Sequence, residues 1–368
     1  MTLALGDHDR GETLLREALA LCGALENHEG HACALGSLAH LALRQGDSER
    51  AIAYHEESLI YFRKSGIRSS LNGPLGELGY LHLRRGDSQR ATALFEEQWA
   101  LGREHNDRGV VARAQWHLGL VASYAGDYER ARALFEECLT VFRERGYKTC
   151  IADALHGQGM VAERTGRYPE ARAHHDEALA IRRVMQDPWD IANSLDRLGW
   201  VALREGELAA ARAILDESLA LFRQVGDQRG LASTLFSLGK LAATQGDPVE
   251  AQQLIEASLK LRQAVGDKPG IAQCFEALAA LHTRPARAAR NRSARAAERA
   301  ARLLGAAESL RQAIGAPLPP AEREECERCV AAARDLLGEA GFAALRAEGG
   351  EVALEEVVAF ALHEASAA

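Results

Sequence analysis

Residues 126–139 contain the pattern that decides the fold, and they read Gly126-Asp127-Tyr128-Glu129-Arg130-Ala131-Arg132-Ala133-Leu134-Phe135-Glu136-Glu137-Cys138-Leu139. A glycine takes the left-handed conformation that ends a helix without strain, and an aspartate beside it caps the free N–H groups of the next helix. After this pair, apolar residues recur at helical spacing through Phe142. The stretch therefore predicts a tight turn followed by an amphipathic helix.

The same turn returns every forty residues, at Gly6, Gly46, Gly86, Gly126, Gly166, Gly206 and Gly246, with aspartate next to it at Asp7, Asp47, Asp87, Asp127 and Asp247. An alanine follows five residues after each later glycine, at Ala51, Ala91, Ala131, Ala171, Ala211 and Ala251. A second series of turn residues lies between these turns, at Gly66, Asn106, Gly146, Gly226 and Gly266. Two turns in each repeat predict two helices. One such hairpin cannot bury its apolar faces alone, whereas stacked hairpins can.

A Leu-Gly pair also recurs within the repeats, at Leu78-Gly79, Leu118-Gly119, Leu198-Gly199 and Leu238-Gly239. We expect each of these glycines to lie where the two helices of a hairpin touch, because a side chain there would keep them apart. The spacing of Leu118-Gly119, Ala131, Phe135 and Cys138 resembles the tetratricopeptide repeat (TPR). Here the usual unit of about 34 residues is lengthened, and its closing proline is missing. The resemblance implies an all-α fold, a right-handed superhelix (α-solenoid) of 40-residue hairpins with C-terminal capping helices.

We expect three regions along the chain. Residues 1–283 form the array of about seven units, and the first unit lacks its first helix because the turn at Gly6 belongs inside a unit. Residues 284–294 form an arginine-rich insertion, after which the repeat alanine arrives late, at Ala300. Residues 295–368 form a helical cap. This tail, with Ile314-Gly315-Ala316-Pro317 and Leu354-Glu355-Glu356-Val357-Val358, resembles the end of the arrays in LuxR- and AfsR-type regulators and STAND-class predicted ATPases.

Composition sets limits on the function. The formal net charge of −8 gives no general reason to expect binding to nucleic acid. The arginines of the insertion could form a basic ribbon, but a solvated surface is the commoner role of such a run. No signal peptide or membrane-spanning run is apparent, and the seven cysteines are an odd number, so we expect reduced thiols in a cytoplasmic protein.

The motifs that could carry chemistry are weak. Cys326-x-x-Cys329 has no second ligand pair for zinc, and we expect both cysteines to be packed helix residues. His28-Glu29-Gly30-His31 is one residue short of a zinc motif, and His175 occupies a position that phenylalanine takes in other repeats. No Walker motif for nucleotide binding is present. We therefore predict no metal, no cofactor and no catalytic residues, and we do not expect an enzyme.

The resemblance implies a binding groove instead, because the first helices of TPR units line the concave face. Carried over, the inward positions are Tyr80, Arg113, Trp116, Tyr124, Asp153, His156, Met160, Arg164, Asn193, Asp196, Trp200, Arg204, Phe236 and Lys240. Aromatic and charged side chains in such a row suit a protein or peptide segment, with a small effector as a second ligand class. We expect a binding scaffold or sensor module from a bacterial signal-responsive transcriptional regulator. The alternative is a regulatory C-terminal fragment of a STAND-type NTPase switch.

Overall fold

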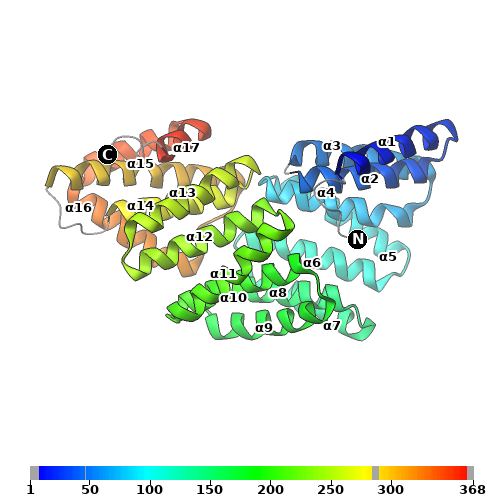
Figure 1. Cartoon of the computed structure of the whole chain (residues 1–368), viewed down its shortest axis with the longest axis horizontal. Coiled ribbons are helices and arrows are strands. Elements are labelled where there is room, and N and C mark those ends of the chain that lie inside the picture. The colour runs from blue at the N-terminus through cyan, green and yellow to red at the C-terminus, as the bar shows by residue number, and fades with distance from the viewer. Residues whose placement is uncertain (1–7, 46, 284–289, 363–368) are drawn as a thin grey trace. The chain divides into compact units, whose positions relative to one another are not determined.

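The chain folds into helices, as expected. The computed structural model describes residues 8–45, 47–283 and 290–362, and all regular structure within these ranges is helical (Figure 1). Besides one 3₁₀ helix, η2 (Arg68–Leu71), the α-helices are α1 (His8–Ala24), α2 (His28–Arg44), α3 (Ser48–Ser65), α4 (Asn72–Arg84), α5 (Ser88–Glu104), α6 (Arg108–Tyr124), α7 (Tyr128–Arg145), α8 (Lys148–Arg164), α9 (Tyr168–Met185), α10 (Pro188–Arg204), α11 (Leu208–Val225), α12 (Gln228–Gln245), α13 (Pro248–Ala264), α14 (Lys268–Thr283), α15 (Arg290–Ile314), α16 (Pro320–Glu351) and α17 (Leu354–Leu362).

Both series of turns lie where the repeat places them. Gly86, Gly126, Gly166, Gly206 and Gly246 all have positive φ, as do the residues of the second series. Asp47 and Asp87 cap the helices that follow, each accepting a hydrogen bond from a backbone N–H three residues later. Gly6, Asp7 and Gly46 lie outside the described residues. The Gly86-Asp87 turn thus combines a left-handed residue with a capped helix start, whereas Arg167 and Glu207, at the equivalent position of later repeats, make no side-chain cap.

The second series of turns has two members that the sequence did not reveal. Glu26 and Gln186 take positive φ at the equivalent positions, although neither is a glycine or asparagine. The fourth helix also starts late, because η2 replaces its first turn. Pro74 has no N–H to donate to a carbonyl four residues earlier. Because the α-helix begins at Asn72, Pro74 lies in its first turn, where no such bond is needed.

The repeat glycines bring the two helices of a hairpin together. A Cβ on Gly79 would lie 2.4 Å from the ring of Phe95, and one on Gly159 would lie 2.3 Å from the ring of His175. Gly119, Gly199 and Gly239 make the same contact with the equivalent residues of their own hairpins. The residue opposite the glycine is fully buried in each case. The expected contact is confirmed, including the core position of His175.

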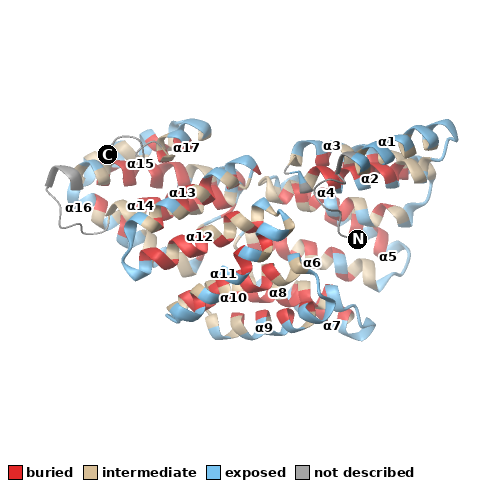
Figure 2. Ribbon diagram, viewed as in Figure 1, coloured by how far each residue is buried: buried red, intermediate tan, exposed pale blue. Residues whose placement is uncertain are grey.

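The described residues divide into two compact units. The first comprises residues 1–121 and 133–150, and the second comprises residues 122–132 and 151–368. Within each unit, buried residues recur along the helices (Figure 2). In the second unit, α8, α10, α12 and α14 are the first helices of their hairpins, and α9, α11, α13 and α15 are the second helices. This order places the groove positions on every second helix.

The C-terminal helices continue the second unit. A Cβ on Gly305 of α15 would lie 1.9 Å from the carbonyl oxygen of Arg346, and one on Gly349 of α16 would lie 2.1 Å from that of Arg302, so the two backbones touch. α16 changes direction at Gly338, which has non-helical φ and ψ. Residues 284–289 of the predicted insertion lie outside the described residues, and Arg290 already belongs to α15.

Candidate binding groove

The predicted groove residues occupy a few equivalent positions on consecutive first helices. Trp116, His156, Asp196 and Phe236 are forty residues apart, and the other ten lie at three further positions of the same period on α4, α6, α8, α10 and α12. Tyr80, Arg113 and Trp116 belong to the first unit, and the remaining eleven belong to the second. The two sets are therefore described separately.

In the first unit the three residues are accessible to different degrees. Arg113 is exposed, and its Nη2 lies 3.4 Å from Sγ of Cys150. Trp116 and Tyr80 are half-buried, and the Trp116 ring lies 4.9 Å from that of His117. Below them, His117 stacks on Phe95 and bonds through Nδ1 to Oε1 of Gln98 at 2.9 Å. Burial lowers the pKa of His117 to about 3, so this imidazole is a neutral core group.

In the second unit several groove positions belong to buried ion-pair networks. Arg182 of α9 donates to Oδ1 of Asp153 at 2.9 Å and to Oγ of Ser194 at 3.0 Å, and it lies 3.6 Å from Asp190. The Arg182 side chain is only 5% exposed, so its charge depends on these carboxylates. Burial raises the pKa of Asp190 despite the attraction of Arg182. The carboxylate of Asp153 is thus held by an arginine of its own hairpin.

A second network surrounds Asp196. Ser233 donates to its Oδ2 at 2.7 Å, and Arg197 pairs with the same oxygen. Arg197 also reaches Glu163, whose other oxygen lies 2.7 Å from Nε2 of His175. Burial opposes the charge on Arg197, but the carboxylates of Asp196 and Glu163 outweigh it and raise its pKa. Because Asp196 is buried, its carboxylate holds the neighbouring side chains of the predicted groove in place and is not free for a ligand.

The imidazole of His156 is neutral. Burial, together with the positive charges of Arg182 and Arg197, holds the pKa of His156 well below its usual range. Its ring meets that of His175 edge to face at 5.4 Å. Its Nδ1 is buried without a hydrogen-bond partner. His156 therefore contributes a polar surface without a charge.

Stacked arginines lie toward the C-terminal ends of the first helices. The guanidinium of Arg164 lies 4.8 Å from the ring of Tyr124, and that of Arg204 lies 5.4 Å from the ring of Tyr168. Tyr168 also accepts a hydrogen bond from Nε of Arg204 at 2.9 Å. Arg164 also donates to the carbonyl oxygen of Ser123 at 3.4 Å. Planar cations held over aromatic rings are fixed in orientation.

The chain itself covers part of the predicted groove. Residues 315–328, which we call the strap, run from the end of α15 into the first turns of α16. Arg204 donates to the carbonyl oxygen of Ala321 at 3.1 Å, and Nζ of Lys240 donates to Oε1 of Glu325. A pocket remains beside these contacts, lined by Trp200, Phe236 and residues of α14 and the strap. The predicted positions Trp200, Arg204, Phe236 and Lys240 thus come together under the strap.

The sequence contained signals for these features. Arg182 and Arg262 occupy the position that Phe142 and Phe222 take in other repeats, and an arginine in a core position requires a buried carboxylate or aromatic partner. The guanidinium of Arg262 lies 4.8 Å from the ring of Phe236. The sequence gives a weaker signal for the strap, which consists of a proline-rich start followed by glutamates.

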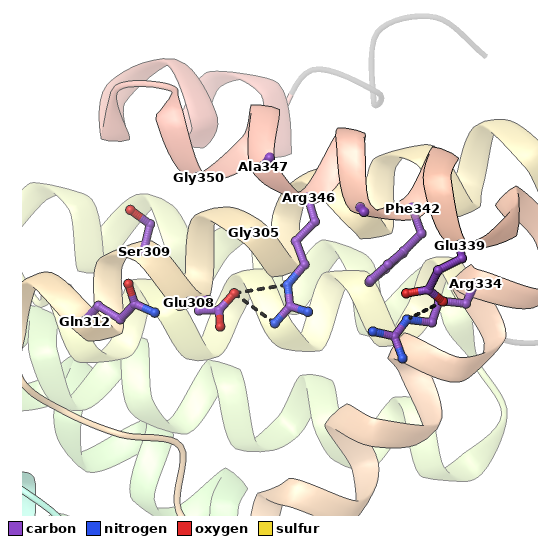
Figure 3. Close-up of a pocket in the computed structure, with 11 residues that line it drawn as sticks. Gly305, Glu308, Ser309, Gln312, Arg334, Glu339, Phe342, Arg346, Ala347 and Gly350 are labelled. Carbon is purple, nitrogen blue, oxygen red and sulfur yellow. Dashed lines mark hydrogen bonds and ion pairs between the residues drawn. The ribbon is translucent and has the colours of Figure 1, made fainter.

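A second pocket, of about 400 Å³, lies between α15 and α16 beside the close approach of Gly305 (Figure 3). Glu308 and Arg346 pair across it at 2.8 Å, and Arg334 lies 3.4 Å from Glu339. Phe342 lies between these two pairs (Figure 3). The charged groups of this pocket are therefore paired with each other.

The weak motifs are packed side chains. Burial raises the pKa of Cys326 to about 11, and Sγ of buried Cys329 accepts a hydrogen bond from Thr283 at 3.3 Å. His31 stacks on Tyr61 at 4.0 Å. Across the described ranges, no three His, Cys, Asp or Glu residues come together as a metal site. No described helix combines the length and the apolar character that a membrane span needs.

Comparison with known proteins supports the fold. A family model described as tetratricopeptide repeat matches residues 1–64, 70–144, 110–183, 150–224 and 190–264. A search of curated proteins found no significant match. Solved structures with similar folds include a Rap protein complexed with competence and sporulation factor, at 13% identity and a TM-score of 0.59, covering 93% of this chain and 98% of that one.

Two other solved structures resemble the chain. The apo form of the quorum sensor NprR from B. thuringiensis has 15% identity and a TM-score of 0.56, covering 82% of this chain and 83% of its own. A STAND protein with a tetratricopeptide repeat sensor from Pyrococcus horikoshii has 13% identity and a TM-score of 0.50, covering 88% of this chain and 54% of its own. At these identities the similarity concerns the fold alone.

Proposed function

Because this chain belongs to the tetratricopeptide repeat family, we propose that it is a scaffold or sensor module that binds a protein or peptide segment along the first helices of its repeats. The observation that carries this proposal is the strap. A stretch of polypeptide lies across α10 and α12 and uses Arg204 and Lys240, two of the residues expected to meet a ligand. A surface that holds one polypeptide segment through backbone and side-chain contacts has the chemistry to hold another.

The groove positions other than Arg204 and Lys240 support a mixed polar ligand. Arg164 keeps its guanidinium over Tyr124, while Asn193 and Met160 are half-buried on the neighbouring first helices. Arg164 can pair with a carboxylate of a ligand, and the aromatic ring below it limits the entropy lost on binding. The networks around Arg182 and Arg197 keep the surrounding helices in place. This combination favours a short peptide with an acidic residue.

The test is a selection of peptides from a displayed random library by the purified intact chain. Selected peptides should bind Arg164→Glu at least about tenfold more weakly, the loss of one charge-assisted contact. The matched control is Arg183→Glu on α9, an exposed residue with the same charge change. Equal binding to Arg164→Glu and Arg183→Glu, with both variants folded by circular dichroism, would remove the groove assignment.

We propose more finely that the module comes from a signal-responsive bacterial transcriptional regulator. The resemblance of its tail to the arrays of such regulators supports this, and NprR, a quorum sensor, shares the fold. The second candidate is the sensor part of a STAND-type NTPase, which is favoured by the fold shared with the P. horikoshii protein. Reading the coding DNA upstream of Met1 separates them, since an in-frame Walker motif is expected only for the NTPase.

A further inference from the structure

The strap contacts successive repeats in steps of four residues. Pro317 lies 2.8 Å from where a Cβ on Gly126 would be, and Ala321 lies next to Gly166 and accepts from Arg204. Glu325 then bonds to Lys240. One step beyond the strap is Cys329, which accepts from Thr283 at the end of α14. From Ala321 onward the chain is helical and four residues are about one turn, so one side of α16 meets one repeat after another.

The strap extends further back along the array than a segment that only caps the last hairpin would need to. A cap for the last hairpin needs only to cover α14 and α15, and the later part of α16 does so: Cys329, Ala333 and Phe342 are buried in the cluster around those helices. The strap instead extends back to the turns at Gly126 and Gly166, which lie several repeats earlier. Its contacts at Pro317, Ala321 and Glu325 therefore lie on earlier repeats, while Arg311 of α15 donates to the carbonyl oxygen of Ala316 at 3.4 Å and lies 3.9 Å from Glu322.

The strap also matches the charges beneath it. Glu325 lies between Lys240 and Arg204, whose Nη1 is 4.0 Å from its second oxygen. Burial would raise the pKa of Glu325, but these two cations outweigh it and lower the pKa. The other side of the same helix carries the exposed residues Arg323, Glu324, Glu327 and Arg328. The packed side thus carries Glu325, with the small residues Ala321 and Cys329 one turn away on either side, and a second carboxylate, Glu322, which lies 3.9 Å from Arg311.

Two non-helical glycines flank this region. Gly315, with φ of 62°, ends α15 and begins the strap, and Gly338, with φ of 74°, breaks α16 beyond the strap. Between the strap and Gly338, Cys329 and Ala333 are buried against α14 and α15, and beyond Gly338 the contacts of Gly349 with the backbone of Arg302 hold α16 to α15. The strap can therefore leave the groove while the cap stays in place only if α16 unwinds before Cys329.

We propose that the ends of α10, α12 and α14 form a docking surface for a helix with one carboxylate between two small residues, that the strap occupies this surface in cis, and that a partner helix of the same chemistry binds by displacing it. This inference rests on the proposed function and names its partner class. A tethered segment competes at an effective concentration in the millimolar range, so the closed chain binds partners weakly.

The experiment compares two charge reversals on the intact chain. Glu325→Lys places a cation against Arg204 and Lys240 and should release the strap, whereas Glu324→Lys makes the same change on the exposed side. The probe is a fluorescein-labelled peptide of residues 315–330 with the natural sequence. Fluorescence anisotropy should show at least about tenfold tighter binding to Glu325→Lys than to Glu324→Lys or the wild type. Hydrogen exchange of residues 316–327 should rise only in Glu325→Lys.

The outcomes separate the two proposals. Equal hydrogen exchange in the two variants would overturn occupation in cis, and failure of the Glu325→Lys chain to bind the peptide would overturn the docking surface. Adding Lys240→Glu to Glu325→Lys restores an ion pair and should return exchange and binding toward wild type; no such return would also contradict the proposal. Peptides selected from the library that bind all chains equally well would leave the proposed function standing and refute only the strap.

Discussion

The ring of Phe135 lies where a side chain on Gly119 would have to go, since a Cβ built on that glycine would be 2.8 Å from Cε1 of Phe135. Phe135 is fully buried, so the ring has little room to move away. The same pairing of a glycine and a bulky residue recurs through the array. The hairpins owe their close approach to this absence of a side chain.

Gly119→Leu should therefore destabilise the protein by about 1–3 kcal/mol, the usual effect of overpacking a core. Thermal unfolding followed by circular dichroism measures the change. The control is Gly36→Leu, because a Cβ at Gly36 on α2 meets nothing within 4 Å. Equal melting of the two variants would show that the glycine contact does not limit hairpin packing.

Arg182→Met should destabilise the second unit by about 3 kcal/mol, because it leaves the carboxylate of Asp190 without its buried counter-charge. Urea unfolding gives the free energy. Arg183→Met is the matched control, since this neighbour is 57% exposed and its change should cost at most about 0.5 kcal/mol. Adding Asp190→Asn to Arg182→Met should recover part of the loss; a double variant no more stable than Arg182→Met would contradict the network.

Acid should destabilise the protein through His117. Its folded pKa of about 3 lies below the ordinary value of 6.5, so the imidazole stays neutral in the folded state and takes up a proton on unfolding between these values. Stability contributed in this way falls as pH decreases from 6.5 toward 3, by up to about 1.4 kcal/mol per pH unit.

His117→Asn keeps an N–H for Gln98 and removes this titration. Unfolding free energies measured through that pH range should fall less steeply for the variant, while burial of His55, whose pKa is about 4, leaves a remaining slope of the same sign. Parallel curves for wild type and variant would mean that His117 is not buried as a neutral group.

Cys326 should resist alkylation in the folded protein. With its pKa raised to about 11 by burial, only about 0.1% of this thiol is ionised at pH 8. Mass spectrometry after a short treatment with iodoacetamide should find Cys326 and Cys329 unmodified, and both should react in denaturant. Rapid modification of Cys326 without denaturant would contradict the packed environment of this pair.

The sequence by itself determined the repeat. Its period, both turns and the glycine contacts depend on sterics within one hairpin. The same residue types then recur at the same positions of the next repeat. The core role of His175 could be predicted for the same reason, because its position is defined by Phe95 and Phe135 in equivalent hairpins. The positive φ of Glu26 and Gln186 could not be predicted, because their neighbours impose a left-handed conformation that their own side chains do not favour.

Only the tertiary structure decided which of the predicted groove residues are engaged within the chain. Asp153 and Asp196 had the right spacing for a ligand, but Arg182 of the next helix pairs with Asp153, and Ser233 of α12 joins Arg197 in binding the carboxylate of Asp196. Glu325 is eighty-five residues from Lys240 and belongs to no repeat, so no periodicity relates the two. Local sterics set the hairpins, whereas the contact between a non-repeated segment and a distant surface depends on matching shape and charge that exist only once the chain is folded.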